Sequence, residues 1–114
     1  MTSKVYKIKY ASQVATELRK VKAYVLEKSQ SKDTSQRYVS QLVKGMEILK
    51  LFPEVGFNAD KKFGRVITEN MTTRGMPLKK DYIALYTIDD NNLVVNIIYL
   101  FSTKSDYMKL LKHN

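Results

Sequence analysis

The stretch that decides the fold is Leu93–Phe101, LVVNIIYLF, which is apolar at nearly every position. A strand with one buried face alternates apolar and polar residues, whereas a strand covered on both faces reads as a continuous apolar run. We therefore predict that this segment is a central strand, covered by helices on one face and partly covered on the other.

Two extended segments precede this central strand. Tyr82–Ile88 is predicted to pair with it as a hairpin, because residues 89–92, DDNN, form a turn signal between the two. Thr72–Leu78 is predicted to be a further extended segment. It contains Gly75 and Pro77, which suit the edge of a sheet better than its centre.

A short C-terminal helix is predicted directly after the central strand. If Thr103 is its N-cap, the pattern Thr-x-x-Asp that ends at Asp106 is a capping box. Lys104 then falls in the first helical turn, where the helix macrodipole disfavours a cation while the free backbone N–H groups favour a phosphate. Lys104 is therefore a candidate functional residue.

The N-terminal half predicts a strand and a helical hairpin. Val5–Tyr10 alternates large and basic residues with period two, as a half-exposed strand does. Ser12 is predicted to cap a helix that ends near Ser29, and Asp33 with Gln36 resembles a capping box that opens a second helix. The apolar faces, at helical spacing, are Val14, Leu18, Val21 and Val25 in the first helix, and Val39, Leu42, Val43, Met46 and Leu49 in the second.

These elements together predict an α+β fold. Pro53 and Gly56 end the second helix, and residues 57–70 are predicted to be a loop or an edge strand around Val66–Thr68. The order is an N-terminal strand, a two-helix hairpin, and then an antiparallel sheet of three to four strands with a short C-terminal helix. Residues 1–114 are predicted to form a single domain.

The net charge and the amino-acid composition limit the classes of function that the protein can have. Lys and Arg number 20 against 11 Asp and Glu, so the formal net charge is +9, which suits nucleic acid, an acidic protein or an anionic membrane surface. The chain has no cysteine, which excludes disulfides, thiolate chemistry and zinc fingers, and we expect no metal and no cofactor. No apolar run approaches the roughly 18 residues of a membrane span, so a cytoplasmic protein is the simplest interpretation.

Three further segments, taken with the order of the elements, make the chain resemble a known family. They are Leu51–Gly56, Arg74–Tyr86 and Tyr99–Tyr107. In this order they resemble the RelE/ParE superfamily of toxins from bacterial toxin–antitoxin modules. The resemblance implies one of two activities: RelE-like members cleave messenger RNA in the ribosomal A site, and ParE-like members poison DNA gyrase. It also implies a cognate antitoxin, and an acidic antitoxin would suit this basic chain.

The resemblance to RelE-like toxins implies candidate catalytic residues. RNA cleavage needs a base for the attacking 2′-hydroxyl, an acid for the leaving 5′-oxygen and cations near the phosphate. The only histidine is His113, which excludes a two-histidine mechanism. RelE-like toxins use lysine, arginine and tyrosine instead. The residues that match, expected to converge on one face of the sheet, are Arg74, Lys104 and Tyr107 as catalytic residues and Lys79 and Lys80 as substrate-binding residues.

Four of these residues also have an interpretation in which they play no functional role. Lys79 and Lys80 can belong to a solvated loop. Arg74 can protect an exposed sheet edge against aggregation, and the ring of Tyr107 can pack in the core with Leu110 and Leu111.

One departure from the RelE pattern keeps the alternatives open. In RelE-like enzymes an arginine often follows the first tyrosine of the strand that resembles Tyr82–Tyr86, and Ile83 occupies that position here. The sequence favours a metal-independent messenger-RNA endonuclease slightly over a gyrase poison without nuclease activity. A third hypothesis is a non-enzymatic nucleic-acid-binding domain, which would bind RNA or DNA in a salt-sensitive way without arresting growth.

Overall fold

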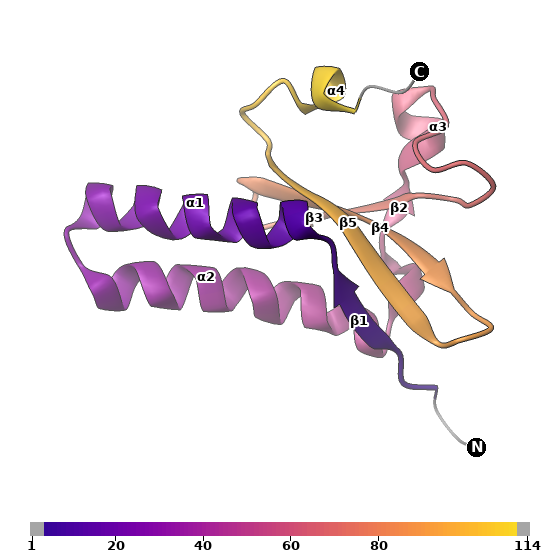
Figure 1. Ribbon diagram of the computed structural model, residues 1–114, viewed down its shortest axis with the longest axis horizontal. Coiled ribbons are helices and arrows are strands. Elements are labelled where there is room, and N and C mark those ends of the chain that lie inside the picture. Colours follow the sequence, from indigo (N-terminus) through magenta and orange to yellow (C-terminus); the bar gives the residue numbers. More distant parts are fainter. Residues whose placement is uncertain (1–3, 112–114) are drawn as a thin grey trace.

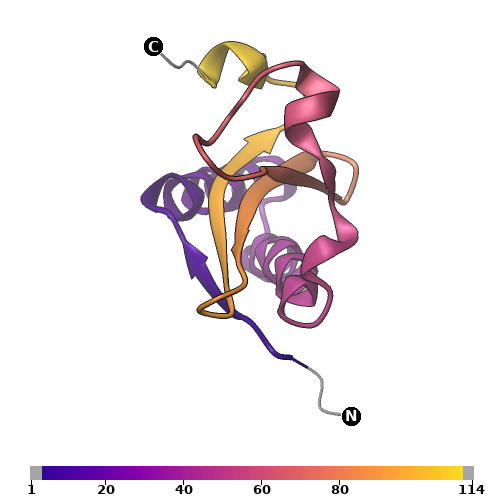
Figure 2. The ribbon, with the colours of Figure 1, turned by 90° about the vertical axis from the view of Figure 1, so that its right-hand side faces the viewer.

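The computed structural model describes residues 4–111, except for the side chains of Met108 and Leu110. Two long helices lie beside a twisted sheet, and two short helices lie together at the end of the molecule farthest from the N-terminus (Figures 1 and 2). In chain order the elements are β1 (Lys7–Tyr10), α1 (Ser12–Ser29), α2 (Lys32–Glu47), the 3-10 turns η1 (Ile48–Lys50) and η2 (Pro53–Val55), β2 (Phe57–Asn58), α3 (Ala59–Phe63), β3 (Arg74–Leu78), β4 (Tyr82–Asp89), β5 (Val94–Ser102) and α4 (Tyr107–Leu110).

The sheet has five strands in the order β1-β5-β4-β3-β2, so the apolar β5 is an inner strand, as predicted. Strands β2 to β5 pair antiparallel with their neighbours, while β1 pairs parallel with β5. The predicted α+β fold is confirmed, but the sheet is mixed and larger than the expected three or four antiparallel strands. The difference arises because the N-terminal strand β1 joins the same sheet and because β2 is also part of it. With two residues, β2 is too short to show the alternation of apolar and polar residues that predicts a strand.

The two faces of the sheet bury separate apolar clusters. The face toward α1 and α2 carries the larger cluster, in which Tyr86, Leu42 and Met46 are fully buried. The opposite face carries a smaller cluster around Leu85 and Phe101, to which residues near α3 and α4 contribute. Successive residues of β4 point to opposite faces, so Tyr86 belongs to the first cluster and Leu85 to the second.

Three predicted helix caps are wrong. Helix α1 has Ala11 at its N-cap with no side-chain bond, so Ser12 is already helical. Helix α2 is capped by Ser31, whose hydroxyl accepts a hydrogen bond from the Thr34 backbone N–H at 3.1 Å, and not by Asp33.

The third correction affects Lys104. Helix α4 begins at Tyr107 with Asp106 at its N-cap, so the residues from Thr103 form a turn instead of a first helical turn. The Thr103 hydroxyl donates to the Lys80 carbonyl at 3.1 Å, which ties this turn to the β3–β4 hairpin. Lys104 therefore precedes the helix, and the argument from the helix macrodipole does not apply to it.

Residues 57–70 form more structure than predicted. They contain β2 and α3, and Val66 lies in the loop that follows, where Thr68 and Met71 make an isolated bridge. His113 lies outside the described residues. Within residues 4–111, no helix combines the length and the apolar composition that a membrane span requires.

Candidate functional site

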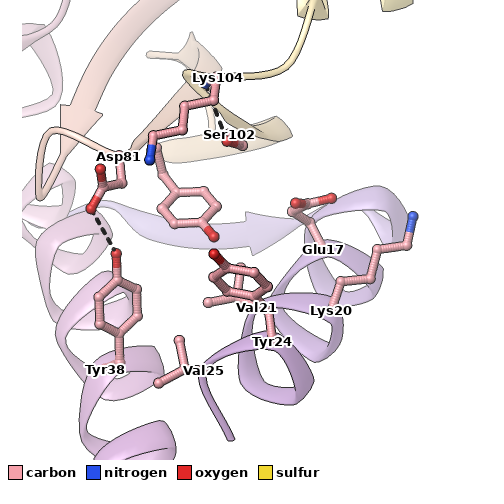
Figure 3. Close-up of a pocket in the computed structure, with 10 residues that line it drawn as sticks. Glu17, Lys20, Val21, Tyr24, Val25, Tyr38, Asp81, Ser102 and Lys104 are labelled. Carbon is pink, nitrogen blue, oxygen red and sulfur yellow. Dashed lines mark hydrogen bonds between the residues drawn. The ribbon is translucent and has the colours of Figure 1, made fainter. Parts of the chain in front are cut away.

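A pocket of about 540 Å³ lies where the helical hairpin meets the ends of β4 and β5 (Figure 3). Its floor is apolar, because Val21 and Val25 of α1 face into it. Its walls are aromatic and charged. The remaining lining residues are Glu17, Lys20, Tyr24, Tyr38, Asp81, Tyr82, Ser102 and Lys104.

Three tyrosine rings give the pocket its shape. Tyr38 of α2 and Tyr82 of β4 pack edge to face, with ring centroids 6.3 Å apart. The Lys79 ammonium lies 5.2 Å from the centroid of the Tyr38 ring, and the Lys28 ammonium lies 5.7 Å from that of Tyr24. Tyr24 is 59% exposed, so its ring is available to a partner.

The hydroxyls of Tyr38 and Tyr82 keep their protons at physiological pH. Burial raises the pKa of Tyr38 to about 12, and the neighbouring Asp81 carboxylate, which accepts a hydrogen bond from the Tyr38 hydroxyl at 3.3 Å, adds to this shift. Burial also raises the pKa of Tyr82, with Glu17 and Asp81 contributing. A general base is most effective when its pKa lies near the working pH. These hydroxyls are therefore suited to donating hydrogen bonds, not to abstracting protons.

The charged groups at the rim of the pocket are available to interact with a ligand. Lys104 extends over the pocket while Lys20 stands at its edge (Figure 3). Neither ammonium makes an ion pair or a hydrogen bond with a described residue, and the same is true of the Glu17 carboxylate. The arrangement offers aromatic and apolar surface flanked by unpaired cations.

Arg74 lies away from this pocket. Its guanidinium donates to the Gly56 carbonyl at 2.8 Å and to the Glu54 carbonyl at 3.3 Å. In the sheet register Arg74 pairs with Tyr86, whereas the pocket lies beyond Tyr82. Four residues of strand separate these positions, which is about 13 Å at about 3.3 Å per residue.

Tyr107 lies on the other face of the sheet. Its ring stacks on Phe101 with centroids 5.7 Å apart and packs edge to face against Phe63 at 5.8 Å. These rings belong to the smaller apolar cluster, and Leu111 is buried in the same place. Ile83 also faces this cluster. The packing interpretation accounts for every contact that Tyr107 makes here.

Lys79 and Lys80 form the β3–β4 turn, where both have positive φ values of 52° and 67°. The Lys79 ammonium donates to the Gln41 side-chain oxygen at 2.5 Å, so this lysine joins the turn to α2. Lys80 is exposed, and its carbonyl accepts from Thr103.

The expectation that Arg74, Lys104 and Tyr107 converge on one face is therefore wrong. Only Lys104 lines the pocket, with Lys79 at its border through Tyr38. The catalytic and substrate-binding roles given to the five residues stay predictions. The pocket residues that the sequence did not reveal are Glu17, Lys20, Tyr24, Tyr38, Asp81 and Tyr82.

Comparison with solved structures identifies the fold. The chain is similar to one from a structure described as the chromosomal ParDE TA system from P. aeruginosa, with a TM-score of 0.67 at 13% identity over 90% of this chain and 100% of that one. It is also similar to a chain of the archaeal RelE-RelB complex from Pyrococcus horikoshii OT3, with a TM-score of 0.55 at 18% identity over 89% of this chain and 99% of that one. The fold is that of the RelE/ParE superfamily.

The family follows from the sequence. The model of the ParE toxin of type II toxin–antitoxin system, parDE, matches residues 8–107, so the chain belongs to this family. No match was found among curated protein sequences. The protein is thus a toxin of a type II toxin–antitoxin system.

Proposed function

We propose that this toxin arrests growth by inhibiting DNA gyrase and that it does not cleave messenger RNA itself. The observation that carries the proposal is the separation of Arg74, Lys104 and Tyr107 among three places in the molecule. Membership of the ParE family supports the same target, because ParE-like toxins act on gyrase.

The chemistry of RNA cleavage makes this separation informative. The base, the acid and the cations must all reach one phosphodiester, with heavy atoms within hydrogen-bond distance, about 3 Å. Arg74 is already occupied by two backbone carbonyls, and Tyr107 is packed among rings on the far face. Lys104 alone supplies a cation but no matched acid and base.

A pair of assays tests the proposal. Purified toxin is added to gyrase with relaxed plasmid, and separately to a translating extract in which message 5′ ends are mapped. We expect loss of supercoiling and intact messages, with toxin premixed with its antitoxin as the inactive control. New message ends at codon boundaries with unaffected gyrase would overturn the proposal in favour of the nuclease.

The partner we propose for the pocket is the cognate antitoxin. An acidic segment that inserts an apolar side chain among the three tyrosines would place its carboxylates beside Lys20 and Lys104, which have no ion-pair partner among the described residues. Charge complementarity of this kind speeds association and selects the partner. The two similar structures, a ParDE system and a RelE-RelB complex, support a toxin–antitoxin pairing.

Reversing the charge of the rim tests the antitoxin site. The double variant Lys20→Glu, Lys104→Glu is expected to bind the antitoxin of the neighbouring gene more weakly and with a smaller dependence on salt. The double variant Lys32→Glu, Lys61→Glu, at two exposed lysines on α2 and α3 that do not line the pocket, is the control with the same change in net charge. Equal affinity for wild type and the double variant, measured by titration calorimetry, would remove the pocket from the interface.

A further inference from the structure

The β3–β4 turn adopts a backbone conformation that its residue types do not favour. Lys79 and Lys80 follow one another with φ values of 52° and 67°. In this left-handed region the Cβ atom of an L-residue comes close to the following carbonyl oxygen, so residues other than glycine rarely occupy it. Both lysines are exposed, so burial in the core does not offset the strain. Such a segment persists only where its surroundings hold it in place.

The three other non-glycine residues with positive φ within residues 4–111 have ordinary explanations. Gln30 is the C-cap of α1, a position at which helices commonly turn left-handed. Asn70 belongs to a residue type that tolerates this region. Leu93 packs against the larger apolar cluster. None of these reasons applies to Lys79 and Lys80.

Contacts with α2 hold one side of the turn. The Lys79 ammonium donates a hydrogen bond to the side-chain oxygen of Gln41, and it also lies 5.2 Å from the centroid of the Tyr38 ring. Tyr38 and Gln41 are three residues apart in α2, so they are neighbours on one face of the helix. The strained turn therefore allows one lysine to contact two adjacent side chains of α2.

Two further contacts hold the Tyr38 ring against the same hairpin. The Tyr38 hydroxyl donates to the Asp81 carboxylate at 3.3 Å, and Figure 3 shows the hydroxyl directed at this group. The Tyr82 ring packs edge to face with the Tyr38 ring at 6.3 Å. Tyr38 lines the pocket, whereas Lys79 and Gln41 do not. Lys79 can thus act on the pocket through Tyr38.

The opposite side of the turn is tied to the segment after β5. The Thr103 hydroxyl donates to the Lys80 carbonyl at 3.1 Å, and the Thr103 backbone N–H donates to the Asp81 carbonyl at 2.9 Å. The next residue, Lys104, lines the pocket. The turn therefore joins two walls of the pocket, one formed by α2 and one formed by the segment after β5.

We propose that Lys79 is a positioning residue for the antitoxin site. The strained turn carries its ammonium to α2, where it holds the Tyr38 ring in the position in which the pocket accepts the antitoxin. This inference rests on the proposal that the antitoxin binds in the tyrosine pocket. A side chain that is already in its bound position loses less entropy on binding, so the partner binds more tightly. The turn lowers the stability of the fold and raises the affinity of the site.

Two glycine substitutions at adjacent positions separate positioning from charge. Lys79→Gly and Lys80→Gly each remove one positive charge and one strained φ, but only Lys79→Gly removes a contact with Tyr38. Lys80→Gly is expected to raise the thermal midpoint, because glycine adopts positive φ without strain, and to bind the antitoxin with an affinity close to that of the wild type. Lys79→Gly is expected to weaken binding about tenfold, as for a ring that occupies the binding position about a tenth of the time. Titration calorimetry measures both affinities.

A second readout follows the Tyr38 ring in the free toxin. Nuclear Overhauser effects (NOEs) between the rings of Tyr38 and Tyr82 are expected to weaken in Lys79→Gly, and also in Gln41→Ala, which removes no charge. They are expected to persist in Lys80→Gly. Lys79→Arg keeps a cation that stacks on the ring and donates to Gln41, so it is expected to preserve both the NOEs and the affinity. A direct contact between Lys79 and the antitoxin would leave the NOEs of the free toxin unchanged.

Three outcomes would overturn the proposal. They are equal affinities of the two glycine variants, NOEs between Tyr38 and Tyr82 that persist in Lys79→Gly, and a thermal midpoint of Lys80→Gly below that of the wild type, which would show that the turn is not strained. Failure of the antitoxin site itself is recognised separately. In that case the Lys20→Glu, Lys104→Glu variant binds the antitoxin as the wild type does, while the NOE comparison still decides whether Lys79 positions Tyr38.

Discussion

At the scale of single residues, Arg74 and Tyr86 have a structural task in common. Both hold the backbone of residues 53–56, Arg74 through two carbonyls and Tyr86 through one carbonyl and one N–H group. A Cβ atom on Gly56 would lie 2.6 Å from the Tyr86 hydroxyl, so this close approach requires glycine. The sequence marked Arg74 as a candidate but gave no reason to connect it with a tyrosine twelve residues later.

Removing the Tyr86 hydroxyl tests this clamp. Tyr86→Phe leaves the buried Gly56 N–H and the Pro53 carbonyl without their partner, so the free energy of unfolding is expected to fall by about 1–3 kcal/mol. Tyr99→Phe, at a tyrosine for which no hydroxyl hydrogen bond is found among the described residues, is expected to change it by less than about 0.5 kcal/mol. Urea denaturation measures both, and equal losses would contradict the clamp.

The pKa of Tyr38 provides a second test at this scale. Replacing Asp81 with Asn removes the negative charge beside the hydroxyl, so the pKa of Tyr38 is expected to fall from about 12 toward the ordinary value of about 10 without reaching it, because burial is the larger cause. The difference between the ultraviolet titrations of each protein and its Tyr38→Phe counterpart isolates this tyrosine. An unchanged pKa in Asp81→Asn would mean that burial acts alone.

The same shift fixes the sign of an alkaline stability change. The folded protein holds the Tyr38 proton more tightly than the unfolded chain does. Its contribution to stability is therefore complete below about pH 10 and is lost as the pH rises through about 12. Asp81→Asn removes a carboxylate that raises the pKa of Tyr38. The variant is therefore expected to lose less stability than the wild type over this pH range.

At the scale of elements, the helices and the inner strands were predictable and their ends were not. Period and apolarity are repeated over many residues, so Val14 and Val21 in one helix and Leu42 and Met46 in the other all identify buried faces. A cap depends on one side chain. Near each helix start several Ser, Thr and Asp residues compete, and only the fold decides which of them meets a free N–H group.

A matched pair of substitutions tests the observed caps. Ser31→Ala removes the hydroxyl that accepts from Thr34 and is expected to lower the free energy of unfolding by about 1 kcal/mol. Ser12→Ala changes a helical position with no cap bond, and alanine has the higher helix propensity, so no loss is expected. Thermal unfolding compares the two, and a larger loss at Ser12 would support the cap that the sequence suggested.

The pocket shows why sites are harder to predict than elements. Lys104 was predicted from its supposed place in a first helical turn, which the structure does not show, and from the resemblance to RelE-like toxins, and it does line the pocket. Tyr24, Tyr38 and Tyr82 come from three elements, and nothing in their sequence spacing indicates that their rings meet. The register between β4 and β5 and the crossing of α1 and α2 bring them together, and both are properties of the folded chain.

At the scale of the whole molecule, the tyrosine pocket brings apolar surface and cations together. Val21 and Val25 line it beside Lys20 and Lys104, and neither lysine makes an ion pair among the described residues. From composition alone the net charge of +9 indicated only that nucleic acid, an acidic protein or an anionic membrane surface binds.

The central position of β5 makes the fold depend on the last quarter of the chain. This strand joins β1, on one side, to β4 on the other, so a chain that ends at Asn92 lacks the strand that unites the two halves of the sheet. We expect such a truncated chain to show no cooperative thermal unfolding by circular dichroism. A cooperative transition would show that the helical hairpin and the remaining strands suffice.

This topology also governs when the protein becomes dangerous to the cell that makes it. During synthesis β1 and the helical hairpin emerge early, but the partner of β1 is β5, which follows after all the other strands. We therefore expect the sheet to remain incomplete, and the toxin unable to act, until β5 has left the ribosomal exit tunnel.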